Sequence, residues 1–479
     1  MPVGAPAAPG PPRRHPATPP TVSTLPTAHL PHEATEPQLP PGVPEAIGKY
    51  RVLRKLGEGA TSEVFLAHDD FHGRDVAIKR VLAANGRSAA ERHFAVHFFA
   101  AEAALVGRLH HPNVVQIYDA VEEGQGRAYL VMEYVRGQTL RSHCAPDRLL
   151  SLEQVVEVGF KCAMALDYVW RQGIIHRDVK PANILTVEEG SDVLDVKLTD
   201  FGSALNLDAE RTQVHRVGSL AYMSPEQLDG ATLDCRADIY SLGAVLYHLI
   251  AGRPPFEAEA QGALLHQICH TPPAPLTGCR AGVSQALSDV VCGALAKSRD
   301  QRPASWQIFA QQLSALIVNH EVPRGRLQQV MDSERFNLLR GLEFFSDFGD
   351  VQLWEVVRQA RWQRFHYGHK LYKRGQLGKQ FYIIAQGEVE VFRDGQRVAR
   401  LGAGTSVGEM AYLAPSPELR RHVAEIIVSE PCTTIAFNPD TLGALSAETR
   451  GRFDAGFIKV LVRRLHAAHE ALAHPRRIL

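Results

Sequence analysis

Cysteine is scarce in this chain of 479 residues, and none of its 7 cysteines has a close partner in the sequence. They stand singly at 144, 162, 235, 269, 279, 292 and 432. No pair has the spacing of a metal site, and the odd number argues against a disulfide framework. The pattern excludes a small disulfide-bonded scaffold and fits a reducing cytoplasm.

The chain also lacks net charge and long apolar runs. Its 52 basic and 52 acidic residues balance, so no general attraction to nucleic acid or acidic membranes follows. The longest apolar runs, such as 242–251, are too short to span a bilayer. The first four residues, Met-Pro-Val-Gly, do not begin a signal peptide. We therefore expect a cytoplasmic protein with neither a nucleic acid nor a membrane as partner.

Proline, by contrast, is concentrated at the start, where residues 1–48 hold 14 of the 30 prolines and almost no apolar periodicity. Such a composition predicts a disordered or polyproline-II tail rather than a packed element.

The most informative stretch is 176–183, which reads His-Arg-Asp-Val-Lys-Pro-Ala-Asn and is followed at 200–202 by Asp-Phe-Gly. Asp178 can accept or orient a hydroxyl proton, and Asn183 and Asp200 offer the hard oxygen ligands that Mg²⁺ prefers. In this order and at this spacing, the two motifs resemble the catalytic and metal-binding loops of eukaryotic-type protein kinases. The resemblance places Lys180 near the transferring phosphate, where a lysine accompanies serine/threonine specificity.

The nucleotide side of the same resemblance lies upstream. Gly57 and Gly59 open a loop that ends at Val64, and glycines let such a loop press closely over phosphates. The family's third glycine is Ser62 here, which is a departure from the pattern. Lys79 ends the apolar run 76–79 and is expected to reach the α- and β-phosphates.

Lys79 needs a carboxylate partner. Residues 92–109 are predicted to form a helix from their apolar spacing, and Glu102 on this helix is the best candidate. Glu91 is the second candidate, although it lies nearer the start of the helix, where an acidic residue also favours the dipole.

The apolar run 129–135 resembles the hinge between the two lobes of a kinase. By that resemblance Met132 lies at the back of the adenine pocket, and backbone groups of Glu133 and Val135 bind the base. An apolar slot with a few polar groups is what a planar base requires.

The stretch after Gly202 resembles an activation segment that closes at Ser224-Pro225-Glu226. Thr212 is its only threonine before Gly218 and is the candidate phosphosite, with Arg177 as the phosphate's partner. A solvated loop threonine is the equally open alternative. The resemblance further implies that Asp238 braces the catalytic loop and that Arg302 pairs with Glu226.

From about residue 341 the chain changes to short alternating runs separated by glycines, which suggests a small β-roll or barrel. This part resembles the cyclic-nucleotide-binding domain, with 381–389 similar to its central hairpin and 407–411 to its phosphate-binding cassette. The resemblance implies that Gly408 and the amides near it meet a cyclic phosphate and that Glu409 binds the ribose. Arg421, with Arg420 as second candidate, would pair with the phosphate. The usual Ala-Ala-Thr after this arginine is absent, so cAMP, cGMP and no ligand at all stay open.

Residues 449–473 are predicted to form an amphipathic helix, similar to the terminal helix that lids the ligand or mediates dimers in that family. A homodimer is therefore one of the open assemblies. Too little chain follows for the helix-turn-helix of related transcription regulators, which excludes a DNA-binding regulator.

These resemblances together predict an α+β chain with a two-lobed protein kinase fold followed by a small β-roll with flanking helices. The expected organisation is a tail at 1–48, a kinase domain at 49–318, a linker at 319–340, a cyclic-nucleotide-binding-like domain at 341–445 and a terminal helix and tail at 446–479. The expected activity is transfer of phosphate from ATP, with Mg²⁺ or Mn²⁺, to serine or threonine hydroxyls of proteins, including the chain itself. The alternative is a non-catalytic nucleotide-binding scaffold with a docking or dimerisation β-roll.

Overall fold

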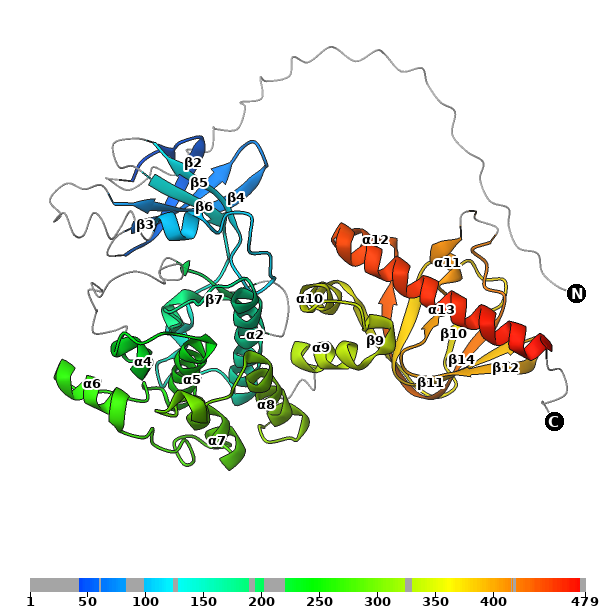
Figure 1. Cartoon of the computed structure of the whole chain (residues 1–479). Helices are drawn as coiled ribbons and strands as arrows, with labels where there is room; N and C mark the ends of the chain where they lie inside the picture. Colours follow the sequence, from blue (N-terminus) through cyan, green and yellow to red (C-terminus); the bar gives the residue numbers. More distant parts are fainter. Residues whose placement is uncertain are drawn as a thin grey trace, which may run out of the picture. The chain divides into compact units, whose positions relative to one another are not determined.

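A six-stranded antiparallel sheet begins the folded part of the computed structural model (Figure 1). The structure describes residues 43–59, 62–82, 99–123, 128–188, 194–201, 220–323, 330–414, 416 and 419–473. The start of the chain, Glu91 and Thr212 lie outside these residues. The six strands are β1 (Ala46–Ile47), β2 (Tyr50–Glu58), β3 (Ser62–Asp69), β4 (Arg74–Val81), β5 (Ile117–Glu122) and β6 (Ala128–Glu133), in the order β1-β2-β3-β4-β6-β5.

Strand β4 lies inside this sheet because Val76, Ala77 and Ile78 are all buried. Its register places Lys79 opposite Val64 of β3 and Leu130 of β6. Lys79 is thereby flanked by an apolar residue on each neighbouring strand.

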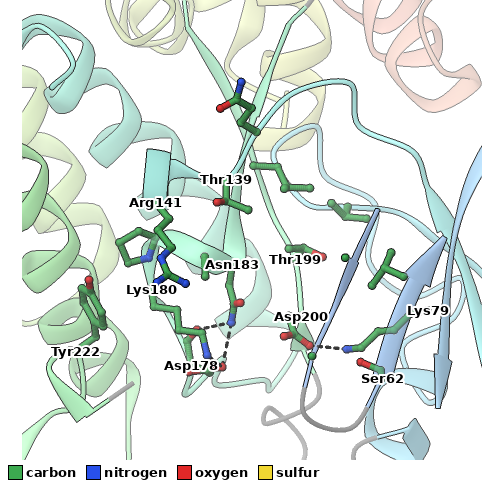
Figure 2. Close-up of a pocket in the computed structure, with 18 of the residues that line it drawn as sticks. Ser62, Lys79, Thr139, Arg141, Asp178, Lys180, Asn183, Thr199, Asp200 and Tyr222 are labelled. Atoms are coloured by element: carbon green, nitrogen blue, oxygen red, sulfur yellow. Dashed lines mark hydrogen bonds and ion pairs between the residues drawn. The ribbon is translucent and has the colours of Figure 1, made fainter. Parts of the chain in front are cut away.

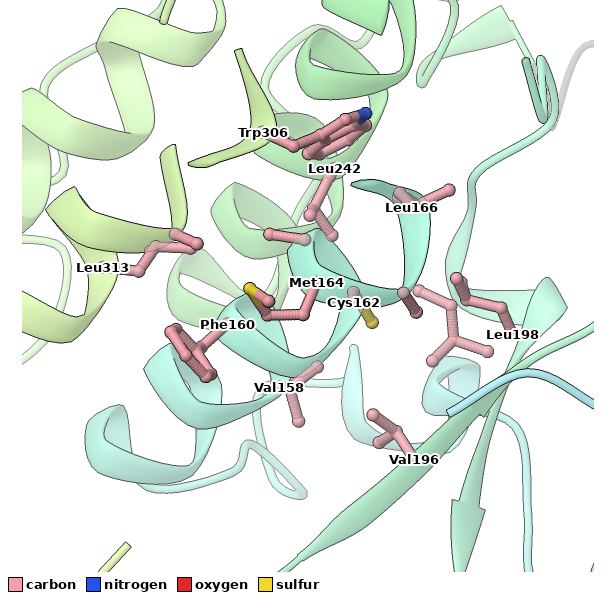
Figure 3. Close-up of a cluster of buried hydrophobic side chains, with 14 of the residues drawn as sticks. Val158, Phe160, Cys162, Met164, Leu166, Val196, Leu198, Leu242, Trp306 and Leu313 are labelled. Carbon is pink, nitrogen blue, oxygen red and sulfur yellow. The ribbon is translucent and has the colours of Figure 1, made fainter. Parts of the chain in front are cut away.

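Helices dominate the next region, where α2 runs through the hydrophobic core. Ser151 caps the start of α2 by accepting from the backbone N–H of Gln154, whose side chain accepts from the N–H of Ser151 in return. Figure 3 shows side chains of α2 packed among those of α5, α8 and β8. The elements are η1 (Leu140–His143), α2 (Leu152–Arg171), η2 (Pro181–Asn183), β7 (Ile184–Val187), β8 (Asp195–Leu198), α4 (Pro225–Leu228), α5 (Cys235–Ala251), α6 (Gln261–His270), α7 (Gln285–Ala294), η4 (Arg299–Gln301) and α8 (Trp306–Val318).

The last region is a β-roll between helices. Its sheet has the order β10-β14-β11-β12, with β13 paired to β11 and β9 paired to β14. The terminal helix α13 lies lengthwise along the roll (Figure 1), and its Phe453 and Phe457 pack against Phe437 and Phe381 of the sheet. The elements are α9 (Asp332–Gly341), η5 (Glu343–Phe345), α10 (Asp350–Gln359), β9 (Arg361–Phe365), β10 (Lys370–Tyr372), β11 (Phe381–Arg393), β12 (Gln396–Leu401), β13 (Ser406–Val407), α11 (Met410–Leu413), β14 (Glu425–Phe437), α12 (Pro439–Gly443) and α13 (Ala447–Ala473).

The expected hairpin at 381–389 is wrong, because these residues belong to the single strand β11. Gly387 sits in it at φ 81°, where the register against β14 shifts. A Cβ at this position would lie 2.2 Å from the carbonyl oxygen of Pro431, so only glycine fits the bulge. The bulge lets one strand bend where the glycine suggested a turn.

Two further features were not anticipated. The segment 319–340, expected only as a linker, contains most of α9, and the long strand β14 was not predicted. The described part of the expected helix 92–109 is helical at 99–103 and continues as turns to 108.

The α+β class is confirmed by this mixture of sheets and helices. Among the residues that the structure describes, no helix is both long enough and apolar enough to cross a bilayer.

Candidate active site

A cleft of about 1480 Å³ is lined by the strands β2, β3, β4 and β6 and by the loops at 177–183 and 199–200. Small-molecule sites usually measure about 300–1,000 Å³. The cleft is therefore large enough for a nucleotide and part of a second substrate. Figure 2 shows the polar side chains from both sides converging on it.

The glycine-containing loop covers one wall of this cleft. Gly57 faces Val64 across β2 and β3, and the N–H of Gly59 donates to the carbonyl oxygen of Ser62 at 2.7 Å. Gly57 has no neighbour that a Cβ would meet, so its surface is open to the cleft. Ser62, in the position of the absent third glycine, is itself buried and lines the cleft.

Lys79 stands between two carboxylates. Its Nζ lies 2.8 Å from Glu102 Oε2 and 2.5 Å from Asp200 Oδ1. The structure thus brings Lys79 together with Glu102, the first-choice partner. Burial alone would lower the pKa of Lys79, but Asp200 and Glu102 outweigh it and raise that pKa.

The two carboxylates respond differently to the shared lysine. Burial raises the pKa of Glu102, with Lys79 opposing the shift. Burial would also raise the pKa of Asp200, but Lys79 holds it below its usual range. Asp200 is the more exposed of the two, with 39% of its side chain accessible, and it lines the cleft.

The loop 176–183 is fastened from behind by α5. Asp238, buried near the start of α5, accepts the backbone N–H of His176 at 2.7 Å and that of Arg177 at 2.8 Å. Arg177 has φ 65°, an unusual conformation that this pair of bonds stabilises. The backbone just before Asp178 is thus held from behind by one buried carboxylate.

Asp178 projects from this loop toward two partners. Its Oδ2 accepts from Lys180 Nζ at 2.6 Å and from Asn183 Nδ2 at 3.0 Å (Figure 2). These two bonds hold the carboxylate of Asp178 in one direction, where it can accept a proton.

Asn183 and Asp200 suit a divalent cation by donor type. Asn183 donates its amide N–H groups to the side chain and backbone of Asp178, which leaves its amide oxygen for another partner. Asp200, at φ 68°, is held with its carboxylate toward the cleft. Amide and carboxylate oxygens are what Mg²⁺ takes from proteins, with substrate phosphates completing the shell.

The predicted hinge lies at the deep end of the cleft. Met132, Glu133 and Val135 all line it, and the N–H of Glu133 is already bonded to the carbonyl oxygen of Gln116 at 2.9 Å. The sequence resemblance assigns binding of a base to backbone groups of Glu133 and Val135, and both residues line the cleft. Val64, Ala77 and Leu185 supply apolar walls.

The end of the activation segment is anchored by two contacts. The guanidinium of Arg302 donates two hydrogen bonds to the carboxylate of Glu226, at 2.6 and 2.9 Å, as predicted for this pair. Gln227 donates to the carbonyl oxygen of Arg177 at 2.8 Å, a link to the catalytic loop that the sequence analysis missed. Its position after Glu226 gave no signal, because the carbonyl it meets lies fifty residues earlier.

The candidate ligand-binding residues of the β-roll do not all come together as those of the cleft do. Glu409 is 2% exposed and pairs with Arg464 of α13, whose guanidinium also donates to the carbonyl oxygen of Ser406 at 2.6 Å. Glu409 Oε2 is buried with no hydrogen-bond partner among the described residues. Arg464 was missed because its partner lies fifty-five residues away.

The predicted phosphate ligand of the β-roll points elsewhere. Arg421 is exposed and donates to the carbonyl oxygen of Gly375 at 2.8 Å, and Arg420 is exposed as well. Gly408 adopts φ 79°, and a Cβ there would lie 2.4 Å from the hydroxyl of Tyr372. The structure therefore does not bring Arg421 to Glu409 in the way that the resemblance implies.

Comparison with known families agrees with both regions. Residues 50–314, more than half of the chain, match the family described as "Protein kinase domain", and residues 362–449 match "Cyclic nucleotide-binding domain". Both resemblances drawn from the motifs, and with them both parts of the expected fold, are confirmed.

The chain is also similar to curated bacterial proteins. It is 38% identical over 274 residues to "Probable serine/threonine-protein kinase PknB" of Bifidobacterium longum, covering 55% of this chain and 39% of that protein. It is 38% identical over 299 residues to "Serine/threonine-protein kinase PknB" of Mycolicibacterium smegmatis, covering 61% and 46%, and 37% identical over 278 residues to "Serine/threonine-protein kinase Pkn1" of Myxococcus xanthus, covering 57% and 39%. The chain thus spans less than half the length of each of these relatives.

Proposed function

Because this chain belongs to the protein kinase family, we propose that it transfers the γ-phosphoryl group of ATP to serine or threonine hydroxyls of proteins, including its own. The observation that carries the proposal is the placement of Asp178. Its carboxylate is oriented by Lys180 and Asn183 and lies in the same cleft as the Lys79–Asp200 pair.

The residues divide the work of positioning and charge neutralisation, which phosphoryl transfer chiefly requires. Asp178 accepts the proton of the attacking hydroxyl, and Lys180 lies beside it to stabilise charge on the transferring group. Lys79, held by Glu102, binds the nucleotide phosphates. Asn183 and Asp200 would hold Mg²⁺ or Mn²⁺, which neutralises phosphate charge when bound.

The competing function is a non-catalytic nucleotide-binding scaffold. A scaffold needs the cleft but has no use for an aimed proton acceptor. The bonds from Lys180 and Asn183 to Asp178, together with Asp238 behind the loop, therefore favour catalysis.

The acceptor class is tested by incubating the protein with labelled ATP, Mg²⁺ and a mixed peptide pool, followed by phosphoamino-acid analysis. We expect phosphoserine and phosphothreonine. Label found on tyrosine alone would contradict the proposal, as would an absence of label.

We include Thr212 in the proposal as a site of autophosphorylation, on the sequence argument alone. Phosphosite mapping after incubation with Mg-ATP tests it. Full activity with Thr212 unmodified would show the assignment to be wrong.

For the β-roll we propose a cyclic nucleotide as regulatory ligand. The support is the family match together with Glu409, whose buried and unpartnered Oε2 can accept a bond from a ribose hydroxyl. Because Glu409 is nearly inaccessible, binding requires the side chains around it to move.

Calorimetry of the full chain with cAMP and with cGMP tests this ligand, with Glu409→Gln as the variant. We expect heat with one of them and its loss in the variant. Glu390→Gln is the matched control, because Glu390 on β11 pairs with Arg397 and Arg400 of β12, and this variant should bind normally. No heat with either nucleotide would leave the β-roll as a docking or dimerisation module.

The proposed organisation keeps a kinase domain at 49–318 and a cyclic-nucleotide-binding-like domain at 341–445. The free cysteines support the proposal of a reducing, cytoplasmic setting.

A further inference from the structure

Helix α2 carries two charged side chains that are completely buried, Glu157 and Lys161. They face α9, which lies between the two family matches. Lys161 Nζ is 2.8 Å from Asp332 Oδ2, and Glu157 accepts from the hydroxyl of Ser333 at 2.5 Å and from its backbone N–H at 3.2 Å. The start of α9 therefore completes a polar cluster that α2 alone would leave unsatisfied.

An aromatic cluster seals the same contact. Phe160 of α2 packs against Phe336 of α9 and Trp354 of α10, with ring centroids 6.0 and 6.2 Å away, and all three side chains are buried. We call α9 and α10, with the side chains of α2 that they cover, the joint.

Asp195, the first residue of β8, links the joint to the catalytic region. One of its carboxylate oxygens meets Asn113 Nδ2 at 2.9 Å and Lys161 Nζ at 3.3 Å. The other accepts from Arg358, near the end of α10, at 2.6 Å.

Strand β8 leads directly to the proposed metal ligands. Its last residue, Leu198, pairs with Ile184, the residue after Asn183, and the N–H of Thr199 donates to the carbonyl oxygen of Asn183 at 3.0 Å. Asp200 comes next. A shift of β8 at Asp195 would consequently move both Asn183 and Asp200.

On its other side, Arg358 is tied closely to the β-roll. Only Ala360 separates α10 from β9, and Trp362 of β9 pairs with Ile435 of β14. The guanidinium of Arg335 on α9 lies 5.6 Å from the ring of the same Trp362. A change in the β-roll thus has a short, packed route to Arg358.

We propose that Arg358 is a positioning residue for phosphoryl transfer, holding β8 through Asp195 so that the β-roll can act on Asn183 and Asp200. The inference rests on the proposed kinase function. Arg358 touches neither nucleotide nor acceptor, so it acts only through the strand that it holds.

The exposure of the Arg358 side chain distinguishes a positioning role from a role in global stability. The side chains of Arg358 and Asp195 are 28% and 22% exposed, whereas those of Lys161 and Glu157 are fully buried. Without Arg358, the carboxylate of Asp195 would keep its contacts with Lys161 and Asn113. Removing Arg358 should therefore leave the chain folded and change mainly the local order of β8.

The test compares the full chain with Arg358→Gln, Arg358→Lys and the control Arg361→Gln, an exposed arginine on β9. Hydrogen–deuterium exchange is followed in peptides that cover 194–200, alongside kcat, KM for ATP and thermal unfolding. We expect faster exchange in these peptides and a kcat lowered about 3- to 30-fold for Arg358→Gln, the range of measured long-range couplings. KM and the unfolding temperature should stay near wild type, with kcat restored by Arg358→Lys.

The proposal is overturned if β8 exchanges alike in Arg358→Gln and Arg361→Gln. It is also overturned if exchange rises throughout the chain with a lower unfolding temperature, since that would reveal a role in global stability only. Absence of transfer by the wild type would instead refute the kinase proposal. The exchange of β8 in Arg358→Gln and Arg361→Gln would still test the link between Arg358 and β8 on its own.

Discussion

Two lysines, one in the cleft and one in the joint, are both paired with carboxylates and differ in what they face. Lys79 lies between Glu102 and Asp200, and Lys161 lies against Asp332. The cleft cluster opens outward, because the Asp200 side chain is 39% exposed, whereas Lys161 is sealed. The same pairing of a lysine with carboxylates serves chemistry where it borders a cleft and serves attachment where the lysine itself is fully buried.

The largest effect on stability should come from the joint. Lys161→Met leaves Glu157 and Asp332 without their buried cation, which should lower the free energy of unfolding by about 3–5 kcal/mol. Urea denaturation measures this, with the exposed Lys373→Met as control. A loss below about 1 kcal/mol would mean that the joint is not closed as described.

The corresponding change in the cleft should act on catalysis. Lys79→Met removes one preorganised cation, which should lower kcat/KM by about 10²–10³-fold. Its cost in stability should be smaller than that of Lys161→Met, because water can reach Asp200. Equal losses of stability in Lys79→Met and Lys161→Met would contradict the claim that the cleft lysine serves catalysis and the joint lysine serves stability.

The joint also predicts a pH dependence. Burial raises the pKa of Glu157 from 4.5 to about 7, with Lys161 opposing the shift. The folded chain then binds the extra proton, so the stability that this group adds is complete below about pH 4.5 and declines as pH rises to about 7.

The free energy of unfolding of the wild type minus that of Glu157→Gln, measured by denaturation across this pH range, should therefore fall by roughly 2–3 kcal/mol as pH rises. A difference that stays flat, or that rises with pH, would show that the carboxyl group is not desolvated.

The smallest effect on stability should come from an exposed ion pair at the edge of the joint, between α9 and α10. Arg340 pairs with Asp350 at 2.9 Å, but 43% of its side chain is exposed. Arg340→Gln should change the free energy of unfolding by less than about 1 kcal/mol. A loss of unfolding free energy near that of Lys161→Met would mean that the exposed Arg340–Asp350 pair, rather than the buried Lys161, stabilises the joint.

The cleft could be predicted from the sequence because its residues lie in short motifs. Asp178 and Asn183 share one loop, and Lys79 and Glu102 fall on elements whose apolar spacing could be read. The predicted residues of the cleft that the structure describes come together.

The joint could not be predicted in this way. Lys161 meets residues that lie 34 and 171 positions later in the chain, and no local pattern marks such a pair. Glu157 and Lys161 lie one helical turn apart on α2, and their burial depends on α9, which lies far along the chain. Arg464 likewise meets Glu409, which lies fifty-five positions earlier in the chain. Contacts between distant segments decide these residues, and a single sequence carries no signal for them.

The central claim is that Asp178 is the catalytic proton acceptor of a kinase. The direct test is single-turnover transfer from labelled ATP by the wild type and by Asp178→Asn, with ATP binding measured in parallel. We expect both proteins to bind ATP with similar affinity and the variant to transfer about 10²–10⁴-fold more slowly, the usual contribution of general base catalysis. Equal incorporation by the two proteins would contradict the claim and favour the non-catalytic scaffold.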